Sequence, residues 1–168
     1  MEIKYAGHFL RFVQDGKWEF AERTNCDGAA AVIAFTEAGE LVLIRQYRPP
    51  VGSHAIELPA GLVGDEKHLG EEEFVEAAKR ELEEETGYHA DELELIGKGP
   101  TTPGLSSETV HLYLARKVRQ VSEGGGVANE SIEVFTVPGA ELAGWLMARE
   151  AGGDVIDLKV HIARAFLP

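Results

Sequence analysis

Three glutamates, Glu81, Glu84 and Glu85, have a spacing that could support metal chemistry. A helix advances about 100° per residue, so side chains three and four positions apart lie on one side of it. Carboxylates gathered in this way repel one another unless a cation binds among them or some of them are protonated. Carboxylate oxygens suit a hard ion, and Mg²⁺ or Mn²⁺ therefore fits such a site better than zinc.

The helix that must carry these glutamates is predicted from an apolar stripe in the same stretch. Apolar residues recur at helical spacing, namely Phe74, Ala78 and Leu82, with Val75 beside them. Gly87 is suited to end the helix in a left-handed conformation. The glutamates border the stripe, so we expect them at the edge of a buried face, in a cleft. A solvated acidic helix is the usual meaning of a glutamate run, but this register argues against it.

The same stretch resembles the Nudix box, which is written Gly-x5-Glu-x7-Arg-Glu-U-x-Glu-Glu-x-Gly-U with U a bulky apolar residue. From the first glutamate onward every fixed position matches, at Glu72, Arg80, Glu81, Leu82, Glu84, Glu85, Gly87 and Tyr88. The pattern places its glycine at position 66, where this chain has Glu66. Gly61 is similar to the family glycine, which makes the following loop five residues longer than in the pattern. Such length is cheaply tolerated in a loop, so we expect the helix to be unaffected.

This resemblance implies a fold, a reaction and a set of metal ligands. The fold class is α/β, a Nudix-type α/β/α sandwich with a mixed β-sheet and an N-terminal antiparallel strand extension, in a single domain over residues 1–168. The implied reaction is hydrolysis of a phosphoanhydride with Mg²⁺, or Mn²⁺ in its place, as cofactor. Glu81, Glu84, Glu85 and the backbone carbonyl of Ala60 are expected to hold the metal.

Two further roles follow from the resemblance. Related enzymes place a glutamate over the metals as catalytic base, from a loop that corresponds to residues 121–130. That loop contains three successive glycines, and glycines let a loop change shape as a lid must. Glu130 is the best match for the base, Glu133 is its competitor and Glu123 lies farther off; a solvent-facing loop acid is the alternative. Arg80 is expected to brace the box loop through Glu72 or to pair with Glu84.

Two arginines end an otherwise apolar strand predicted over residues 40–47. A diphosphate needs positive partners near so acidic a helix, since two like charges about 4 Å apart cost on the order of 4 kcal/mol at an effective dielectric of 20. Guanidinium groups suit phosphate oxygens, so Arg48, and less so Arg45, is predicted to bind substrate. The alternative is that either arginine only neutralises the glutamates. Glu57 is expected to face the substrate or the metal.

The stretch around these arginines, residues 43–49, resembles the ADP-ribose pyrophosphatase branch. So does Pro103, which lies 16 residues after Gly87, and in relatives a glutamate placed like Glu108 approaches the substrate or metal. The implied substrate is ADP-ribose or a related nucleoside diphosphate sugar, split into a nucleoside monophosphate and a sugar phosphate. One alternative is hydrolysis of nucleoside triphosphates or dinucleotides. Another is a non-catalytic nucleotide-binding regulator, whose sequence signature would be lost box glutamates.

Residues 3–13 and 17–23 are predicted to be two strands around an Asp-Gly turn at residues 15–16. Trp18 on this hairpin is either a core or dimer-packing aromatic or a surface on which a nucleobase stacks. Enzymes of the branch often exchange such strands between subunits, and the exchanged strands help form the nucleoside pocket, which the resemblance implies here as well. The resemblance therefore implies a homodimer in which residues 1–25 are exchanged.

The remaining elements are read from the pattern of apolar runs and turn residues. We predict strands over residues 28–35, 93–97, 109–118 and 132–137, and helices over 139–151 and 156–167. Trp145, Leu146, Val160 and Phe166 are expected in the core or in an interface.

The net charge of -13 is mostly local, because 13 of the 29 acidic residues lie between Asp65 and Glu94. It argues against nucleic-acid binding, which needs a basic face. Cys26 is the only cysteine, so no internal disulfide is possible and a reducing cytoplasm fits. No apolar signal stretch or membrane-spanning run is seen, and we therefore expect a cytoplasmic protein without a membrane partner.

Overall fold

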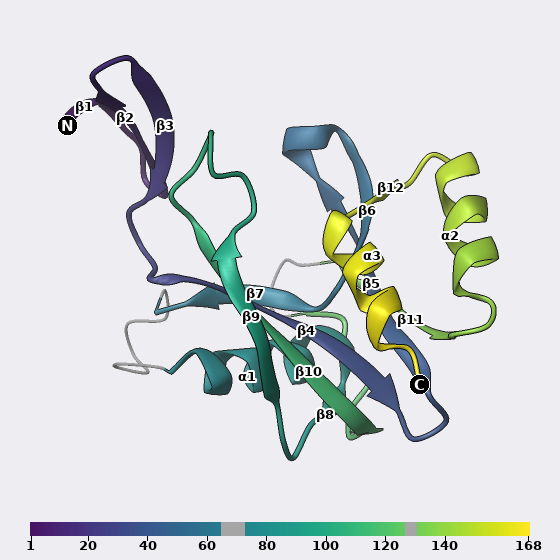
Figure 1. The fold of residues 1–168 in the computed structure, drawn as a ribbon. Coiled ribbons are helices and arrows are strands. Elements are labelled where there is room, and N and C mark those ends of the chain that lie inside the picture. The colour runs from purple at the N-terminus through teal and green to yellow at the C-terminus, as the bar shows by residue number, and fades with distance from the viewer. Residues whose placement is uncertain (65–72, 127–130) are drawn as a thin grey trace.

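The computed structural model describes residues 1–64, 73–126 and 131–168. Two sheets and several helices make up the fold (Figure 1). In chain order the elements are β1 Glu2–Ala6, β2 Leu10–Asp15, β3 Trp18–Arg23, β4 Gly28–Thr36, β5 Glu40–Arg48, η1 Pro49–Val51, β6 Ser53–Glu57, β7 Ala60–Val63, α1 Phe74–Thr86, β8 Tyr88–His89, β9 Glu94–Pro100, β10 Thr109–Gln120, β11 Glu133–Pro138, α2 Leu142–Ala151, β12 Val155–Ile156, α3 Leu158–Ala163 and η3 Arg164–Phe166. The α/β class predicted from the sequence is confirmed.

The large sheet is mixed and has β4 at its centre. Its path runs β12-β6-β5-β4-β10-β8, with β11 paired to β5, β7 to β4 and β9 to β10. β4 runs parallel to β10 and antiparallel to β7. β4 and β5 are hydrogen-bonded as neighbouring strands at one residue pair only, Phe35 and Leu41, so their pairing ends close to the turn that joins them. This early end of the pairing leaves room at the other end of β4 and β5 for a site.

The sheet is covered on both faces, because β4 is apolar on both sides. Ala30, Val32 and Ala34 pack in one buried cluster with the apolar stripe of α1. Ile33 and Phe35, which alternate with them, pack in a second cluster with α2 and α3. A continuous apolar run of this kind is typical of a strand buried on both faces. The layered sandwich therefore follows from the sequence of β4.

The N-terminal residues form a separate three-stranded sheet that projects from the main body (Figure 1). The prediction of one strand over residues 3–13 is wrong, because the chain turns after β1, where the Gly7 N–H donates to the Leu10 carbonyl at 2.8 Å. The Asp-Gly hairpin is confirmed, with Asp15 opposite Trp18 and Gly16 at φ 59°. Apolar side chains on this sheet are exposed, among them Tyr5 and Trp18.

The C-terminal elements are shorter than predicted. α2 begins at Leu142 instead of residue 139, and the helix expected over 156–167 is divided into β12, α3 and η3. Asp157 explains the later start of α3, since its carboxylate accepts the Lys159 N–H at 2.7 Å and caps the helix. Leu146 and Val160 are buried as expected, and Trp145 and Phe166 pack against the same cluster. In the described part of the chain, no helix is long and apolar enough to span a bilayer.

Candidate active site

Helix α1 has the buried stripe and the stop that its sequence predicts. Ala78 and Leu82 are fully buried, while Phe74 and Val75 pack partly buried against the same cluster. The helix ends at Gly87, which has φ 74° and donates its N–H to the Glu83 carbonyl. The carboxylates of α1 are therefore held in a fixed register against the sheet.

Glu85 lies at the junction of the helix and the sheet. It is only 4 % exposed, and its Oε2 accepts the Ala60 N–H at 2.9 Å. A buried carboxylate requires partners of this kind, because burial without them is costly. This bond ties the end of α1 to the first residue of β7.

Gly61 is the residue on which Glu81 packs. A Cβ built at Gly61 would lie 1.9 Å from Cδ and 2.1 Å from Oε1 of Glu81. No real side chain tolerates such distances, so the carboxylate of Glu81 occupies the space that a side chain at 61 would fill. This contact supports the identification of Gly61 as the box glycine, although five extra residues separate it from Glu72.

Glu81, Glu85, Ala60 and Gly61 border a cavity of about 420 Å³, which we call the polar cavity. It lies where α1 meets the ends of β5, β6 and β7. Charged side chains of both signs line it, namely Glu57, Glu81, Glu85 and Glu108 with Arg23, Arg48 and Lys159. A cavity that combines clustered carboxylates with arginines can hold a metal ion and a polyanion together.

Glu84 differs from the other two box glutamates. It does not border the polar cavity among the described residues, and its Oε2 accepts from Arg80 Nη1 at 3.1 Å. The same Arg80 nitrogen donates to Oε1 of Glu81 at 2.8 Å. The expected pairing of Arg80 with Glu84 inside the helix is thus present, whereas Glu72 lies outside the described residues.

The donor set of the cavity fits a hard divalent cation, since every candidate ligand is an oxygen. Glu81, Glu85 and the carbonyl of Ala60 could hold such an ion. Over residues 1–64, 73–126 and 131–168, no group of three or more His, Cys, Asp or Glu is arranged closely enough to hold a metal. The carboxylates are therefore near one another without forming a closed metal cage.

The two predicted arginines have different surroundings. Arg48 borders the polar cavity, and its Nε donates to Oε2 of Glu57 at 2.7 Å. Arg45 does not border the cavity; it pairs with Glu133 and donates from Nε to Asp154 at 2.9 Å. The hydrogen bond to Asp154 is the main cause of the raised pKa of Arg45. Arg48 and Glu57 are brought together at the site, and Arg45 is held beside it.

Further substrate candidates come from the N-terminal sheet and from the segment between β9 and β10. Glu108 borders the polar cavity and pairs with Arg23, whose place in the site the sequence analysis missed. No spacing signal could have found this pair, because 85 residues separate its members. Trp18 and Pro103 both border a different cavity, of about 330 Å³.

Three acids are the sequence-predicted candidates for the catalytic base. Glu130, the preferred one, lies outside the described residues. Glu133 opens β11 and pairs with Arg45, and Glu123 borders a separate cavity beside Thr86.

The three glycines of the predicted lid loop contact the end of α1. The N–H of Gly125 donates to the Glu85 carbonyl at 2.8 Å, and that of Gly126 donates to the Glu84 carbonyl at 3.0 Å. A Cβ at Gly124 would lie 2.3 Å from the carbonyl carbon of Thr86. The glycines therefore allow two backbones to approach closely and cap the last carbonyls of the helix.

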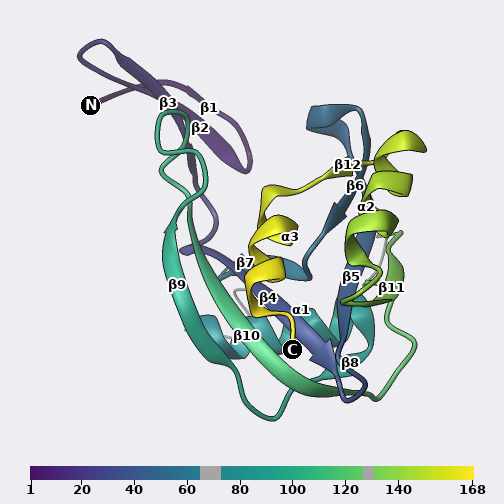
Figure 2. The same cartoon turned by 45° about the vertical axis from the view of Figure 1, so that its right-hand side comes forward.

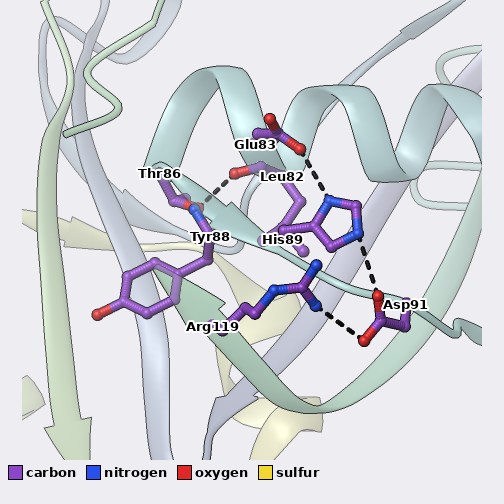
Figure 3. A network of polar contacts seen from close by, with 7 residues as sticks. All are labelled: Leu82, Glu83, Thr86, Tyr88, His89, Asp91 and Arg119. Atoms are coloured by element: carbon purple, nitrogen blue, oxygen red, sulfur yellow. Dashed lines mark hydrogen bonds and ion pairs between the residues drawn. The ribbon is translucent and has the colours of Figure 1, made fainter. Parts of the chain in front are cut away.

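The other side of α1 is fixed by a polar network (Figure 3). Glu83 Oε2 lies 2.9 Å from His89 Nδ1, and His89 Nε2 lies 3.3 Å from Asp91. Arg119 on β10 donates to Asp91 at 2.8 Å, and this bond is the main cause of the lowered pKa of Asp91. The network fastens the end of the helix to β8 and β10 from the side opposite the cavity.

Comparison with known proteins agrees with this geometry. The NUDIX domain family matches residues 27–154. An ADP-ribose pyrophosphatase of Bacillus subtilis (strain 168) is 36 % identical over 155 residues, which are 91 % of this chain and 78 % of that protein. A methanol dehydrogenase activator of Bacillus methanolicus is 41 % identical over 100 residues, 60 % of this chain and 51 % of that protein. The chain thus matches about half the length of the second relative.

A solved structure described as an ADP compounds hydrolase has the same fold. It superposes with a TM-score of 0.64 at 21 % identity, covering 85 % of this chain and 80 % of that one. At this identity the likeness concerns the fold alone. The family match and the Bacillus subtilis relative go further, and together they show that this chain belongs to the NUDIX domain family, as its resemblance to the box implied.

Proposed function

We propose that this protein hydrolyses the diphosphate linkage of ADP-ribose or a related nucleoside diphosphate sugar, giving a nucleoside monophosphate and a sugar phosphate. The observation that carries the proposal is the polar cavity, which Glu81 and Glu85 line together with Arg48. Membership of the NUDIX domain family and the ADP-ribose pyrophosphatase relative support the same reaction.

Mg²⁺ is the proposed cofactor, with Mn²⁺ as a substitute, held by Glu81, Glu84, Glu85 and the carbonyl of Ala60. When bound, such an ion neutralises charge on the diphosphate and lowers the pKa of a bound water. Glu84 would have to leave Arg80 in order to join the other ligands, since Arg80 now donates to it.

The chain's own side chains orient the substrate in this proposal. The bond from Arg48 Nε to Glu57 leaves the two terminal nitrogens of the guanidinium to donate to phosphate oxygens. Glu108, which also borders this cavity, could bind a sugar hydroxyl. Glu130 is proposed to take the proton of the attacking water, as a general base must.

A substrate panel tests the proposal. Purified protein with Mg²⁺ is incubated with ADP-ribose, other nucleoside diphosphate sugars, nucleoside triphosphates and dinucleotides, and the products are separated by chromatography. We expect a nucleoside monophosphate and a sugar phosphate from the diphosphate sugars. Faster release of pyrophosphate from triphosphates would contradict the proposed substrate, and tight binding of ADP-ribose without turnover would contradict catalysis.

We also propose a cytoplasmic homodimer that exchanges residues 1–25. The exposed apolar side chains of the N-terminal sheet, including Ile3, Tyr5, Phe12 and Trp18, support an interface there. The single cysteine supports the location. Deletion of residues 1–25 should yield a monomer by light scattering, and an active, monodisperse dimer after the deletion would refute the exchange.

A further inference from the structure

The positive side chains that border the polar cavity differ in their partners. Two are arginines, and each pairs with a glutamate of the same lining, namely Arg48 with Glu57 and Arg23 with Glu108. The third is Lys159, which pairs with Asp157 at 2.7 Å. Asp157 borders a neighbouring cavity between β9, β10 and α3, but not the polar cavity. Among the described residues, Lys159 thus brings to the polar cavity a positive charge whose partner lies outside its lining.

The segment between β12 and α3 holds Lys159 in this place. Asp157 donates its N–H to the Ile56 carbonyl at 3.0 Å, which ties the segment to β6 beside Glu57. One carboxylate oxygen of Asp157 accepts the Lys159 N–H and the other accepts its ammonium group, both at 2.7 Å. α3 therefore begins beside β6 (Figure 2), with the Lys159 side chain only 21 % exposed.

The ammonium group of Lys159 has donors to spare. It carries three N–H groups, of which Asp157 accepts one. It makes no other polar contact with a described residue. A compact positive charge on a flexible stem suits phosphate oxygens. The lining holds four glutamates, Glu57, Glu81, Glu85 and Glu108, so a diphosphate that enters it gains from every positive charge that remains available.

We propose that Lys159 is a further substrate-binding residue, whose ammonium group donates to a non-bridging oxygen of the diphosphate. The inference rests on the proposed function and adds to it a residue that holds the phosphates. Arg48 then binds the diphosphate from β5 and Lys159 from α3, on two elements that are far apart in the sequence. The alternative is that Lys159 only neutralises Asp157 and so fixes the start of α3.

The test measures binding of the α,β-methylene analogue of ADP-ribose, which cannot be hydrolysed between its phosphorus atoms, by isothermal titration calorimetry with Mg²⁺. Lys159→Met keeps the length of the side chain and removes its charge. We expect Kd to rise by about tenfold, and KM for ADP-ribose by a similar factor while kcat changes by less than about threefold. Lys159→Arg, which restores the charge, should bind within about threefold of wild type.

Lys79→Met is the matched control. It makes the same change in net charge on α1, where Lys79 pairs with Glu76 at 3.4 Å and does not border the polar cavity. It should bind the analogue as wild type does.

A double variant separates contact with the substrate from neutralisation of Asp157. Asp157→Asn keeps an oxygen that can accept the Lys159 N–H, but it removes the negative charge. If Lys159 binds the diphosphate, Lys159→Met combined with Asp157→Asn should remain about tenfold weaker than Asp157→Asn alone. Recovery of wild-type affinity in the double variant would assign the loss to an unpaired Asp157 and overturn the inference.

Unchanged affinity of Lys159→Met, with a melting temperature showing that the variant is folded, would overturn it as well. The proposed function would then still stand, provided that wild type hydrolyses ADP-ribose. The converse result is a wild type that binds the analogue about tenfold more tightly than Lys159→Met and yet hydrolyses no ADP-ribose. That result would contradict the proposed function and support the contact of Lys159 with the diphosphate.

Discussion

Replacing Gly61 by alanine should displace the carboxylate of Glu81 without destabilising the fold. The new Cβ would lie 1.9 Å from Cδ of Glu81, and ordinary contact begins at 3.4 Å. The carboxylate must therefore retreat by about 1.5 Å. Displacements of about 1 Å at a catalytic centre can cost about a hundredfold in rate. We expect kcat/KM to fall by about that factor, with a higher Mg²⁺ concentration needed for half-maximal activity.

The same substitution should leave the fold nearly unchanged. The atoms that the methyl group meets are the far end of the Glu81 side chain, which can rotate away, while β7 keeps its pairing with β4. We expect the melting temperature, followed by circular dichroism, to change by less than about 3 °C, which for a domain of this size corresponds to about 1 kcal/mol.

The control is Gly144→Ala, which makes the same chemical change on α2, where the new Cβ would meet no described atom within 4 Å apart from its chain neighbours and the backbone of its own helix. It should keep full activity and gain slightly in stability, because alanine is the better helix former. If Gly61→Ala retains kcat/KM within about threefold of wild type at every Mg²⁺ concentration, the position of Glu81 does not matter for turnover. The assignment of Glu81 as a metal ligand would then be wrong.

Three further variants probe the neighbouring contacts. Glu85→Gln keeps the size of the side chain and an acceptor for the Ala60 N–H but removes the charge, so turnover should fall at least about a hundredfold while circular dichroism and melting temperature change little. Arg45→Met leaves the buried side chain of Asp154 with a weaker partner, Arg149 at 3.7 Å. We expect the free energy of unfolding to fall by about 2 kcal/mol, seen as a melting temperature about 4–8 °C lower, while KM changes by less than about threefold. A large rise in KM would instead make Arg45 a substrate ligand. Burial, and to a smaller extent the charge of Lys98, lowers the pKa of His111 below 6.5. The imidazole therefore binds a proton more readily in the unfolded chain than in the folded one, and the wild-type protein should lose stability as the pH falls through about 6.5. His111→Phe should lack that part of the loss between about pH 7.5 and 5, and parallel stability curves would contradict this.

The elements predicted correctly are those whose signals are local. The apolar stripe of α1 and the stop at Gly87 lie within one stretch, and the apolar runs of β4 and β5 are long. The turn after β1 was missed because Gly7 lies in an otherwise strand-like run and the bond that closes it joins Gly7 to Leu10. The strand propensities of residues 3–13 do not reveal such a turn, because the turn depends on which strand β1 pairs with.

Pairs that join distant parts of the chain could not be predicted. Arg23 meets Glu108 and Arg45 meets Asp154 only because the sheet topology brings their strands and loops together. The sequence limited the role of Arg45 to substrate binding or charge neutralisation, and the pairing with Asp154 and Glu133 favours the second. The sequence shows which residues are charged, but the partner of each charged side chain depends on the whole fold.

Helical periodicity also could not distinguish Glu84 from Glu81 and Glu85. All three share a side of α1, yet only Glu81 and Glu85 border the polar cavity among the described residues. Arg80 Nη1 bridges Glu81 and Glu84, at 2.8 and 3.1 Å, and so offsets part of the repulsion in the cluster. Two carboxylates about 4 Å apart repel by about 4 kcal/mol at an effective dielectric of 20, which is large against a typical total stability of about 5–15 kcal/mol. An arginine inside the box therefore lets the helix keep its glutamates close together before any metal binds, and a metal that recruits Glu84 must compete with that arginine.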